Sequence, residues 1–542
     1  MNRVADLLAS HFKKWGITHV FGVPGKAVLP IIDAVDNEGI QFILSSQEGA
    51  AGFEAAGYAQ ATGLLGVCVG TSGPGGTNLV TAAAQAKASN LPILILTGHP
   101  SQRETGSGLG QDASIFGTNI VEILKPVTKL SLHLDHASLL ERYLIHCLEQ
   151  ATSGVRGPVH LSIAYDVLNT EIEPFEMEYP CVPKTISNRL HEVTELIMRA
   201  KKPLVFAGKG IHSAQAYAEL QSFVEAFQIP LMTTTSAKSV LPTKHPLNLG
   251  GFGLGGTPEA DEYMSQTDLL IVLGTSMSDM SLAGYNKAAP GPEQIIQFDM
   301  ESTFVGKSIS SPTLAILGDL KANLEEIIRI VQLQHLQAPT KFEHTRAYPD
   351  LYEGQKSDLL LSGEAIQAIQ KYLPDDGLIF GDCGSHTFYA IRDLIVEKPG
   401  SFIFDSYFGA MGHAIGYAVG AKLGDPTRPV ICLTGDGCML MHGTEISTAV
   451  NAQANVIFLV INNGRLDMVE KGMTKYLGKS VGTVYKTPID AAAFGRSLGA
   501  MGYTCTSRAE VEEAFEKALQ ANHPTVIDII VDPNEIPPTM KR

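Results

Sequence analysis

The chain has 542 residues, which is too long for a single hydrophobic core, so about three domains are expected. Its 44% hydrophobic and 18% charged residues are typical of a globular protein, and a net charge of −16 argues against a nucleic-acid partner. No apolar run reaches the ~18 residues of a membrane helix, and Met1–Ser10 show no signal-peptide pattern. Seven cysteines without CxxC spacing predict free thiols, so a cytoplasmic protein is expected.

Strand-like apolar runs alternate with helix-like segments along the whole chain, which predicts an α/β fold with parallel sheets. Two polar, proline-containing segments interrupt this alternation, Asn169–Thr185 and about Leu333–Asp350. Both are predicted to be surface linkers. They divide the chain into predicted domains at 1–170, 186–332 and 351–542.

A short strand is predicted at Gln41–Ser45, followed by a helix from Glu48 to Ala61 that is dense in glycine and alanine. Such small side chains allow close packing against a neighbouring element. A carboxylate at the start of a helix is stabilised by the helix dipole. The residues alone therefore favour a capping role for Glu48 over a catalytic one.

Two glycine clusters invite a ligand-binding interpretation. Thr71–Asn78 follows the apolar run Gly66–Gly70 and opens an alanine-rich helix, so it is compatible with an anion site, but equally with close packing against a cofactor ring or another subunit. Gly251–Gly256 matches GxGxxG, but no clear strand precedes it, so a Rossmann fingerprint is not predicted there.

The most specific pattern is Gly435-Asp436-Gly437, followed later by Asn462-Asn463. The runs Pro429–Thr434 and Asn455–Ile461 read as buried strands, joined by one helix over Cys438–Ala454. A parallel βαβ unit brings both strand ends to one edge of the sheet, where ligands of open α/β sheets bind. Carboxylate and amide oxygens suit Mg²⁺, and the glycines let a diphosphate approach the backbone. Cys438 is interpreted as a small residue at the helix start rather than as a nucleophile.

These motifs together resemble the thiamine-diphosphate enzymes, and among them the acetolactate synthase large-subunit group. The segments that carry the resemblance are Val20–Ile31, Glu48 with its helix, Thr71–Asn78, Asp382–His386, Gly409–Gly412 and the Asp436 and Asn463 pair. They follow one another in the family's order from about residue 3 to the end of the chain.

The resemblance implies three doubly wound parallel-sheet domains: a pyrimidine-binding domain at 1–170, a middle domain at 186–332 and a diphosphate-binding domain at 351–542. In this superfamily the active site lies between the first domain of one subunit and the third of another. The expected assembly is therefore a homodimer, or a homotetramer as in many relatives.

The resemblance also assigns site residues. Mg²⁺ would be held by Asp436, Asn463 and the backbone carbonyl of Arg465, while Gly437 and Cys438 would contact the diphosphate. Gly409 and Met411 would hold the aminopyrimidine, with Met411 as an adaptable apolar wedge. Glu48 would hydrogen-bond the pyrimidine ring nitrogen, which changes its expected role from cap to catalyst. The remaining cofactor-binding positions are Pro24, Gly75, Ser385, His386, Gly435 and Met468.

The implied function is a carboligase that decarboxylates a 2-oxo acid such as pyruvate and joins the resulting enamine to a second carbonyl compound. Glu48 would activate the cofactor by favouring its imino tautomer, and the cofactor would supply the chemistry. The alternatives are a decarboxylase, a C–C lyase or hydrolase, or an FAD-linked 2-oxo acid oxidase. A binding protein without activity is least favoured, because Glu48, Asp436 and Asn463 are all present.

Several positions depart from the synthase pattern and bear on the second substrate. The arginine that grips the acceptor carboxylate falls at Met280, and a methionine cannot make that bidentate contact, so either the acceptor lacks a carboxylate or another residue binds it. Lys26 replaces a glycine and is a candidate carboxylate ligand, although an ordinary solvated lysine is at least as compatible with the sequence. His99 replaces a glutamine and could act as a hydrogen-bond donor or an acid–base group.

Other departures concern the region after the metal loop and the flavin. Asp467 replaces a glycine, and Tyr476–Lys479 occupies the place of a tryptophan-bearing segment, since Trp15 is the only tryptophan. FAD is possible, but Lys125 stands where flavin-binding relatives often have arginine. The paired histidines of pyruvate decarboxylases are not evident, which argues against a plain decarboxylase.

Overall fold

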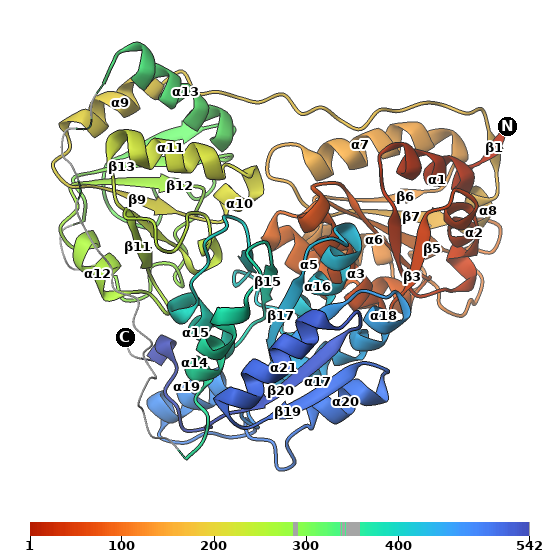
Figure 1. Cartoon of the computed structure of the whole chain (residues 1–542). Coiled ribbons are helices and arrows are strands. Elements are labelled where there is room, and N and C mark those ends of the chain that lie inside the picture. The colour runs from red at the N-terminus through yellow and green to blue at the C-terminus, as the bar shows by residue number, and fades with distance from the viewer. Residues whose placement is uncertain (286–290, 337, 339–341, 343–357, 541–542) are drawn as a thin grey trace.

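The computed structural model describes residues 1–285, 291–336, 338, 342 and 358–540. Three six-stranded sheets, each built of parallel strands and covered by helices, form the bulk of the molecule (Figure 1). The predicted α/β fold with three doubly wound parallel-sheet domains is therefore confirmed. None of the described helices is both long enough and apolar enough to span a membrane.

The N-terminal sheet has the strand order β3-β2-β4-β5-β7-β6. Its strands are buried apolar runs, as parallel strands covered on both faces must be. The strands are β2 (His19–Gly22), β3 (Gln41–Leu44), β4 (Gly66–Gly70), β5 (Ile93–His99), β6 (Leu130–Leu134) and β7 (Val159–Ala164). The helices are α1 (Val4–Lys14), α2 (Leu29–Asn37), α3 (Glu48–Thr62), α4 (Pro74–Asn78), α5 (Val80–Ser89), α6 (Ile120–Leu124), α7 (Leu140–Thr152) and α8 (Tyr165–Leu168).

The middle sheet has the order β11-β10-β9-β12-β13-β14. The strands are β9 (Pro203–Ala207), β10 (Leu231–Thr233), β11 (Asn248–Gly251), β12 (Leu269–Leu273), β13 (Gln294–Asp299) and β14 (Thr313–Leu317). The helices are α9 (Leu190–Arg199), α10 (Gly210–Ala214), α11 (Tyr217–Phe227), α12 (Pro258–Met264) and α13 (Leu320–Leu333). In chain order this is the 3-2-1-4-5-6 arrangement of dinucleotide-binding folds.

The C-terminal sheet has the order β16-β15-β17-β18-β20-β19. The strands are β15 (Leu378–Gly381), β16 (Phe402–Phe404), β17 (Val430–Gly435), β18 (Val456–Asn462), β19 (Met501–Cys505) and β20 (Thr525–Ile530). The helices are α14 (Ser362–Ile369), α15 (Ser385–Asp393), α16 (His413–Gly424), α17 (Asp436–His442), α18 (Ile446–Asn451), α19 (Asp467–Leu477), α20 (Ala491–Ser497) and α21 (Arg508–Gln520).

The first and third sheets share one topology, because both read 2-1-3-4-6-5 when their strands are numbered within the sheet. The strand order reverses beside the first strand, between β2 and β4 in one sheet and between β15 and β17 in the other. Ligands of open α/β sheets bind at such points, beyond the carboxyl ends of the strands. The topology therefore marks one candidate half-site on each domain.

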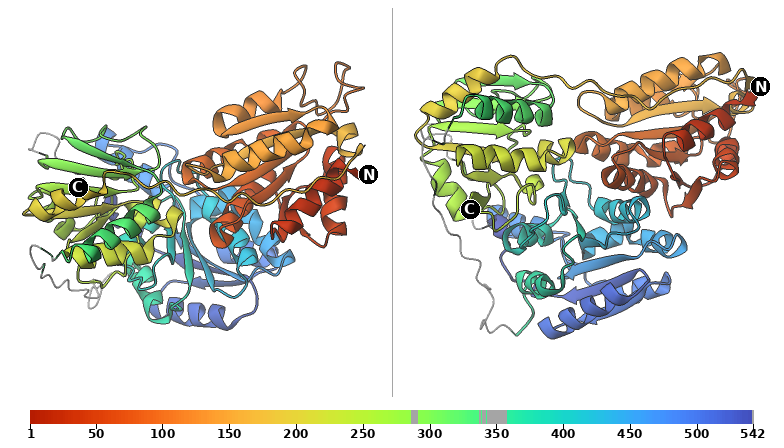
Figure 2. Two further views of the ribbon diagram at one scale, coloured as in Figure 1. Left: turned by 90° about the horizontal axis from the view of Figure 1, so that it is seen from above. Right: turned by 45° about the horizontal axis from the view of Figure 1, so that its top comes forward.

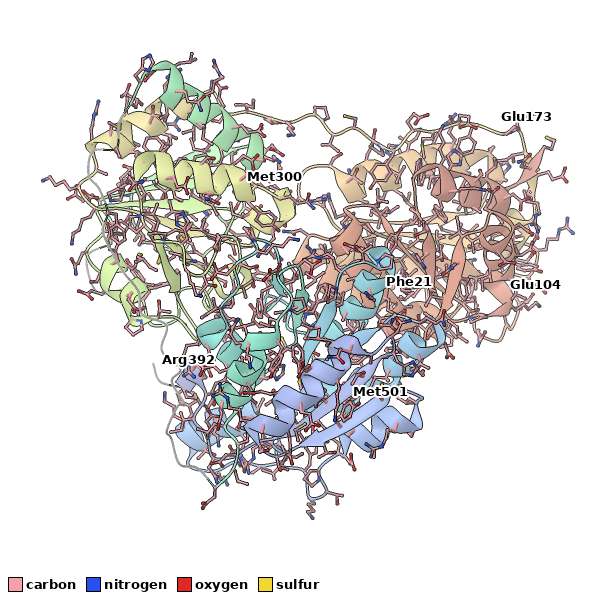
Figure 3. The ribbon with its side chains drawn as sticks, viewed as in Figure 1. Phe21, Glu104, Glu173, Met300, Arg392 and Met501 are labelled. Carbon is pink, nitrogen blue, oxygen red and sulfur yellow. The ribbon has the colours of Figure 1, made fainter. Side chains whose placement is uncertain are left out.

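Helices α3 and α16 join the N-terminal and C-terminal domains. Glycines let the two backbones touch: a Cβ placed on Gly57 would collide with the carbonyl oxygen of Tyr417, and one on Gly420 with that of Glu54. One buried apolar cluster runs through both domains around this helix pair, and Phe21, labelled in Figure 3, belongs to it. The small residues predicted from the sequence thus form a close helix–helix contact between domains.

The middle domain is tied to both others. The segment after α8 crosses from the N-terminal to the middle domain as an extended strap (Figure 2), and Trp15 Nε1 donates to the Met177 carbonyl on it at 3.1 Å. Lys209 pairs with Asp405 of the C-terminal domain at 3.0 Å. The only tryptophan is therefore a structural residue that holds the strap.

Some local predictions were wrong. The single helix predicted over Cys438–Ala454 is broken into α17, a 3₁₀ turn η6 (Gly443–Glu445) and α18, and in this turn the Glu445 side chain and the Thr444 carbonyl accept hydrogen bonds from Ser46 of the N-terminal domain. A strand, β11, does precede Gly251–Gly256; it is an irregular edge strand of sequence NLGG, too short and too glycine-rich to be seen from composition. Glu171–Ile172 (β8), in the first predicted linker, pairs antiparallel with Asn2–Arg3 (β1). The second predicted linker lies mostly outside the described residues, and the domain boundaries remain predictions.

Candidate active site

The C-terminal half-site lies where β15, β17 and β18 end. Asp436 follows β17 directly and is the first residue of α17, and its carboxylate accepts hydrogen bonds from the backbone of Gly437 (2.8 Å) and Arg465 (3.1 Å). Burial raises the pKa of Asp436 to about 6, although these N–H groups oppose the shift. A bound cation would favour the carboxylate, which makes this a suitable metal ligand.

The two adjacent asparagines have different surroundings. Asn462 is buried at the end of β18, and its Nδ2 donates at 2.9 Å both to the Ile489 carbonyl and to Asp528. Asn463 is half-buried and follows Asn462 in the loop that leads to Arg465. Asn462 therefore anchors the loop, and Asn463 is the asparagine that could offer an oxygen to a metal.

A cradle for a diphosphate surrounds the GDG turn. A Cβ on Gly437 would lie 2.6 Å from Leu466 Cδ2 and 3.1 Å from Met411 Cε, and one on Gly435 would lie 2.9 Å from His386 Nδ1. His386 is buried, and its Nε2 has no hydrogen-bond partner among the described residues. Because burial lowers the pKa of His386 to about 4, its neutral ring could donate one N–H to a phosphate oxygen.

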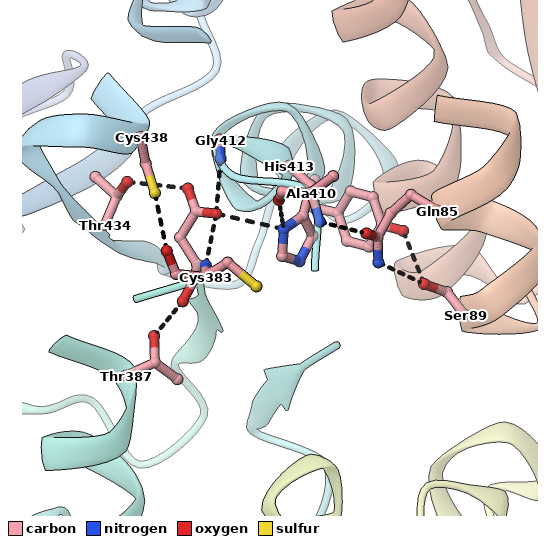
Figure 4. A network of polar contacts seen from close by, with 11 residues as sticks. Gln85, Ser89, Cys383, Thr387, Ala410, Gly412, His413, Thr434 and Cys438 are labelled. Atoms are coloured by element: carbon pink, nitrogen blue, oxygen red, sulfur yellow. Dashed lines mark hydrogen bonds and ion pairs between the residues drawn. The ribbon is translucent and has the colours of Figure 1, made fainter. Parts of the chain in front are cut away.

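Asp382 connects the parts of this half-site (Figure 4). The carboxylate of this fully buried residue accepts from the backbone of Gly412 (2.9 Å) and Cys383 (2.8 Å) and from Thr434 Oγ1 (3.0 Å). Its Oδ1 also lies 3.3 Å from Nδ1 of the buried His413. It therefore holds the 409–413 segment against the ends of β15 and β17.

Charge stabilises the Asp382–His413 pair. Burial pushes the pKa of Asp382 upward, but the hydrogen bond and charge of His413 outweigh it, so the pKa is lowered. Burial pushes the pKa of His413 downward, but Asp382 outweighs it, so that pKa is raised. Neither residue was assigned a role from the sequence, although Asp382 follows β15 as Asp436 follows β17, and that parallel was the available signal.

Cys438 and Met468 complete this half-site. Cys438 is buried in the first turn of α17, its Sγ donates to the Cys383 carbonyl at 3.2 Å, and burial raises the pKa of its thiol well above the usual value. That environment suits the predicted structural role and not a nucleophile. A Cβ on Gly409 would lie 3.5 Å from Cys383 Sγ, and Met468 packs against the core in the first turn of α19.

The N-terminal half-site is built around Glu48. This residue is 8% exposed, and its Oε2 accepts from Asn78 Nδ2 at 2.9 Å. Its Oε1 would lie 3.3 Å from a Cβ on Gly75, so only glycine leaves the carboxylate this space. Glu48 does not cap α3, because the N-cap is Gln47, whose Oε1 accepts from the backbone of Ala50 at 3.2 Å. The carboxylate is thus free of a capping role, and Asn78 is the partner that orients it.

Lys26 and His99 lie at the same edge of this sheet but differ in exposure. Lys26 is exposed at the start of the 3₁₀ turn η1 (Lys26–Val28), two residues after Pro24, and the loop between them touches Thr71. His99 is buried, with its ring centroid 3.8 Å from that of His133. Burial lowers the pKa of His99 and lowers that of His133 to about 4, so both rings are neutral at pH 7.

The structure also shows the surroundings of the positions in and near the middle domain that differ from the synthase pattern. Met280 is half-buried. Its carbonyl accepts a hydrogen bond at 3.1 Å from the backbone N–H of Leu254, which belongs to the loop that follows β11. That loop packs on the C-terminal domain, since a Cβ on Gly255 would lie 3.2 Å from Phe388 of α15. Gly251–Gly256 thus provides close packing between domains. Lys125 pairs with Glu122 on the surface at 3.1 Å.

Three family models of thiamine pyrophosphate enzymes match the chain in order. They are the N-terminal TPP binding domain over residues 2–120, the central domain over residues 190–327 and the C-terminal TPP binding domain over residues 382–529. The chain belongs to the thiamine pyrophosphate enzymes. It is thus an enzyme that depends on this cofactor, also called thiamine diphosphate.

Curated members of this enzyme family match nearly the whole chain. The acetolactate synthase large subunit of Corynebacterium glutamicum is 32% identical over 94% of this chain and 84% of that protein. A probable acetolactate synthase large subunit of Methanocaldococcus jannaschii is 30% identical over 98% and 93%. The acetolactate synthase isozyme 1 large subunit of Escherichia coli is 28% identical over 98% and 94%.

The two half-sites offer what this cofactor needs. The glycine cradle and the unpartnered His386 Nε2 suit the diphosphate, Asp436 and Asn463 offer oxygens to a divalent metal, and the buried Glu48 can meet a ring nitrogen. The structure groups the predicted diphosphate and metal residues on the C-terminal domain. Glu48, Gly75, Pro24 and Lys26 lie together on the N-terminal domain instead.

Proposed function

We propose that the enzyme is an acetolactate-synthase-like carboligase, which decarboxylates a 2-oxo acid and joins the remaining fragment to a second carbonyl compound. The observation that carries the proposal is the combination of a buried, Asn78-oriented Glu48 with the Asp436 and Asn463 half-site, in a chain that matches acetolactate synthases over most of their length. When bound, thiamine diphosphate supplies the carbon nucleophile and the electron sink for decarboxylation.

The protein's own residues bind and orient the cofactor and hold one proton. Asp436, Asn463 and the Arg465 carbonyl would hold Mg²⁺, and Gly437, Cys438 and the neutral His386 would contact the diphosphate. Gly409 and Met411 would support the pyrimidine, with the Asp382 network fixing their segment. Glu48 would hold or release the proton at the pyrimidine ring nitrogen, with Asn78 fixing the direction of its carboxylate.

We further propose that the active site forms between two copies of the chain. Glu48 contacts Asn78 and lies against Gly75 in its own domain, whereas Asp436 contacts Gly437 and Arg465 in the C-terminal domain. A second copy would bring its Glu48 to the diphosphate half-site. Apolar side chains near these half-sites are exposed in the single chain, among them Leu44, Leu440 and Met441, which supports burial against a second copy.

The acceptor is the least constrained part of the proposal. Met280 cannot grip a carboxylate, and the exposed Lys26, two residues after Pro24, is the cation we propose for that contact. The test incubates the protein with thiamine diphosphate, Mg²⁺ and pyruvate, alone and with a panel of 2-oxo acids and aldehydes, and identifies products by NMR. Acetolactate or another joined product supports the proposal. Acetaldehyde alone would indicate a decarboxylase, and no turnover of any 2-oxo acid would contradict the donor assignment.

A flavin-linked 2-oxo acid oxidase is the second candidate, favoured by one observation. A cleft of about 1050 Å³ opens beside the carboxyl ends of the middle sheet, where Gly210, Gly274 and Asp299 line it. This is the position of nucleotides in sheets with the same strand order. If the enzyme is such an oxidase, the purified protein should be yellow, release FAD on acid treatment and consume an electron acceptor with pyruvate. A colourless protein that is active would exclude the oxidase.

A further inference from the structure

Two buried carboxyl groups from different domains meet beneath the start of α3. Glu54 on α3 and Glu445 in η6 are both fully buried, their side chains interact, and the Oε1 atom of each has no other hydrogen-bond partner among the described residues. Adjacent buried carboxyls cannot both be ionised, so one of them keeps a proton. Burial and the charge of Glu445 raise the pKa of Glu54 well above its usual value, which makes Glu54 the group that keeps it.

Glu445 has the surroundings of a carboxylate anion. Its Oε2 accepts from the Ser46 backbone at 3.1 Å and from Thr448 Oγ1 at 2.6 Å, and the Gln47 backbone donates to it as well. Protonated Glu54 adds a further donor, while Glu54 Oε2 accepts from Ser45 Oγ at 2.5 Å. Burial raises the pKa of Glu445, but these four donors oppose the shift.

This contact connects elements that carry the two half-sites. Ser46 and Gln47 are the residues immediately before Glu48, and Gln47 caps α3. On the other side, Glu445 follows α17, whose first residue is Asp436. A second bond strengthens the link, because Ser46 Oγ donates to the Thr444 carbonyl at 3.0 Å. Within one chain, α17, the turn η6 and the hydrogen bonds of Ser46 therefore connect Asp436 to Glu48.

We propose that Glu445 is a positioning residue for the reaction: as an anion bonded to protonated Glu54, it fixes the first turn of α3 and with it the carboxylate of Glu48. The inference rests on the proposed role of Glu48 at the cofactor. Because one chain would lend Asp436 to one site and Glu48 to the other, the same contact would also set the relative position of the two sites in a dimer.

The matched pair Glu445→Gln and Glu54→Gln tests which group is the anion. In Glu445→Gln the amide presents N–H groups to donors, so we expect kcat to fall on the order of 10²-fold, with little change in KM for the 2-oxo acid. In Glu54→Gln the amide N–H replaces the carboxyl proton, so activity should stay within about threefold of wild type. The reverse ranking of the two variants would overturn the assignment of the proton.

A second carboxylate provides the structural control. Glu510 Oε2 accepts from the Thr506 (2.7 Å) and Ser507 (3.1 Å) backbone and from Thr506 Oγ1 (2.9 Å), at the start of the exposed α21. Glu510→Gln therefore weakens a similar helix start that belongs to neither half-site. It should leave kcat and cofactor affinity, measured by calorimetric titration with thiamine diphosphate and Mg²⁺, unchanged.

Hydrogen exchange in the cofactor-free protein gives a readout independent of turnover. In Glu445→Gln the amides of residues 46–50 should exchange about tenfold faster than in wild type, and those of residues 506–511 should not change. Unchanged exchange at 46–50 with wild-type kcat would overturn the proposal. If Glu445→Gln does not fold, Glu54→Leu, which removes the donor to Glu445 together with the acceptor for Ser45 Oγ, must still raise exchange at 46–50. Failure of the wild type to turn over any 2-oxo acid would contradict the proposed function and leave this exchange test valid.

Discussion

At the scale of single residues, the proposed site depends on which of two adjacent polar side chains is already hydrogen-bonded within the fold and which is left for a ligand. Asn462 and Asn463 are adjacent, but the side chain of Asn462 is bonded to Ile489 and Asp528, whereas Asn463 is half-buried and is the asparagine we propose as the metal ligand. Likewise Gln47 caps α3, and this leaves the carboxylate of Glu48 for chemistry. In both cases one residue makes the hydrogen bonds that hold the backbone, and its neighbour is the residue proposed for the chemistry.

Replacing Glu48 by glutamine should lower kcat by roughly 10²–10⁴-fold, because the amide cannot carry the proton that the carboxyl group holds at the cofactor. The side chain is isosteric and the Asn78 contact can be kept through the amide oxygen, so the melting temperature should stay close to wild type. Steady-state kinetics and thermal unfolding check this. Near-wild-type turnover would contradict the role of Glu48.

Replacing each asparagine by alanine should separate their roles. Asn463→Ala should weaken Mg²⁺-dependent cofactor binding with little loss of stability, because it removes a ligand oxygen from a half-buried position. Asn462→Ala removes the Asn462 donor from the buried Asp528, which keeps only backbone donors such as the Ala491 N–H, and should destabilise the fold by about 1–3 kcal/mol. Calorimetric titration and urea unfolding measure the two effects, and the opposite pattern would reverse the assignment of the two asparagines.

At the scale of elements, the contact of α3 with α16 sets where Glu48 lies. Glycines 57, 416 and 420 let the two helices touch, and a Cβ on Gly416 would lie 2.7 Å from the Phe53 Cβ. Gly420→Ala should destabilise the protein by about 1–3 kcal/mol, because the methyl group would collide with the Glu54 carbonyl. Gly472→Ala is the control: nothing lies within 4 Å of its Cβ on α19, so stability should rise by up to about 1 kcal/mol. Equal effects in urea unfolding would contradict the packing argument.

The segment 409–413 is held by an ion pair whose effect on stability depends on pH. Because the pKa of His413 is raised above the ordinary 6.5, its charge contributes fully to stability below 6.5 and this contribution is lost as pH rises through the folded-state value. The melting temperature of wild type should therefore fall relative to that of His413→Phe as pH rises from 6.5 to about 9. Thermal unfolding of both proteins across this range measures the difference, and parallel pH profiles would show that the pair is not charged.

At the scale of the whole molecule, two sheets of the same topology place their points of strand reversal on separate domains. If the site forms between copies, a chain with Glu48→Gln and a chain with Asp436→Asn should complement each other. Each mixed dimer then has one intact site, so an equimolar, randomly reassembled mixture should recover about a quarter of wild-type activity. No recovery, although mass spectrometry shows mixed dimers, would place both half-sites of one active site in the same chain.

The sequence predicted most of what depends on local pattern. Apolar runs ending in GDG and in Asn462-Asn463 predicted β17 and β18 and the proposed metal ligands that follow them, because strand ends and polar residues are adjacent in the chain. It missed β11 and the break at Gly443–Glu445, where contacts with distant residues decide the backbone. It also gave no role to Asp382, His413 or Glu445, because their partners lie far away in the chain.

By itself the sequence therefore determined the fold class, because the alternation of strand-like and helix-like runs is a local pattern, and its resemblance to a known family gave the cofactor; Glu48, Asp436 and Asn463 are its proposed chemistry-bearing residues. Only the tertiary structure decided which asparagine is available, that Glu48 is not a cap, that His99 is buried against His133, and that Glu445 and Glu54 meet beneath α3. The reason is physical: hydrogen bonding, burial and the sharing of a proton depend on neighbours that folding brings together, and no local pattern records them.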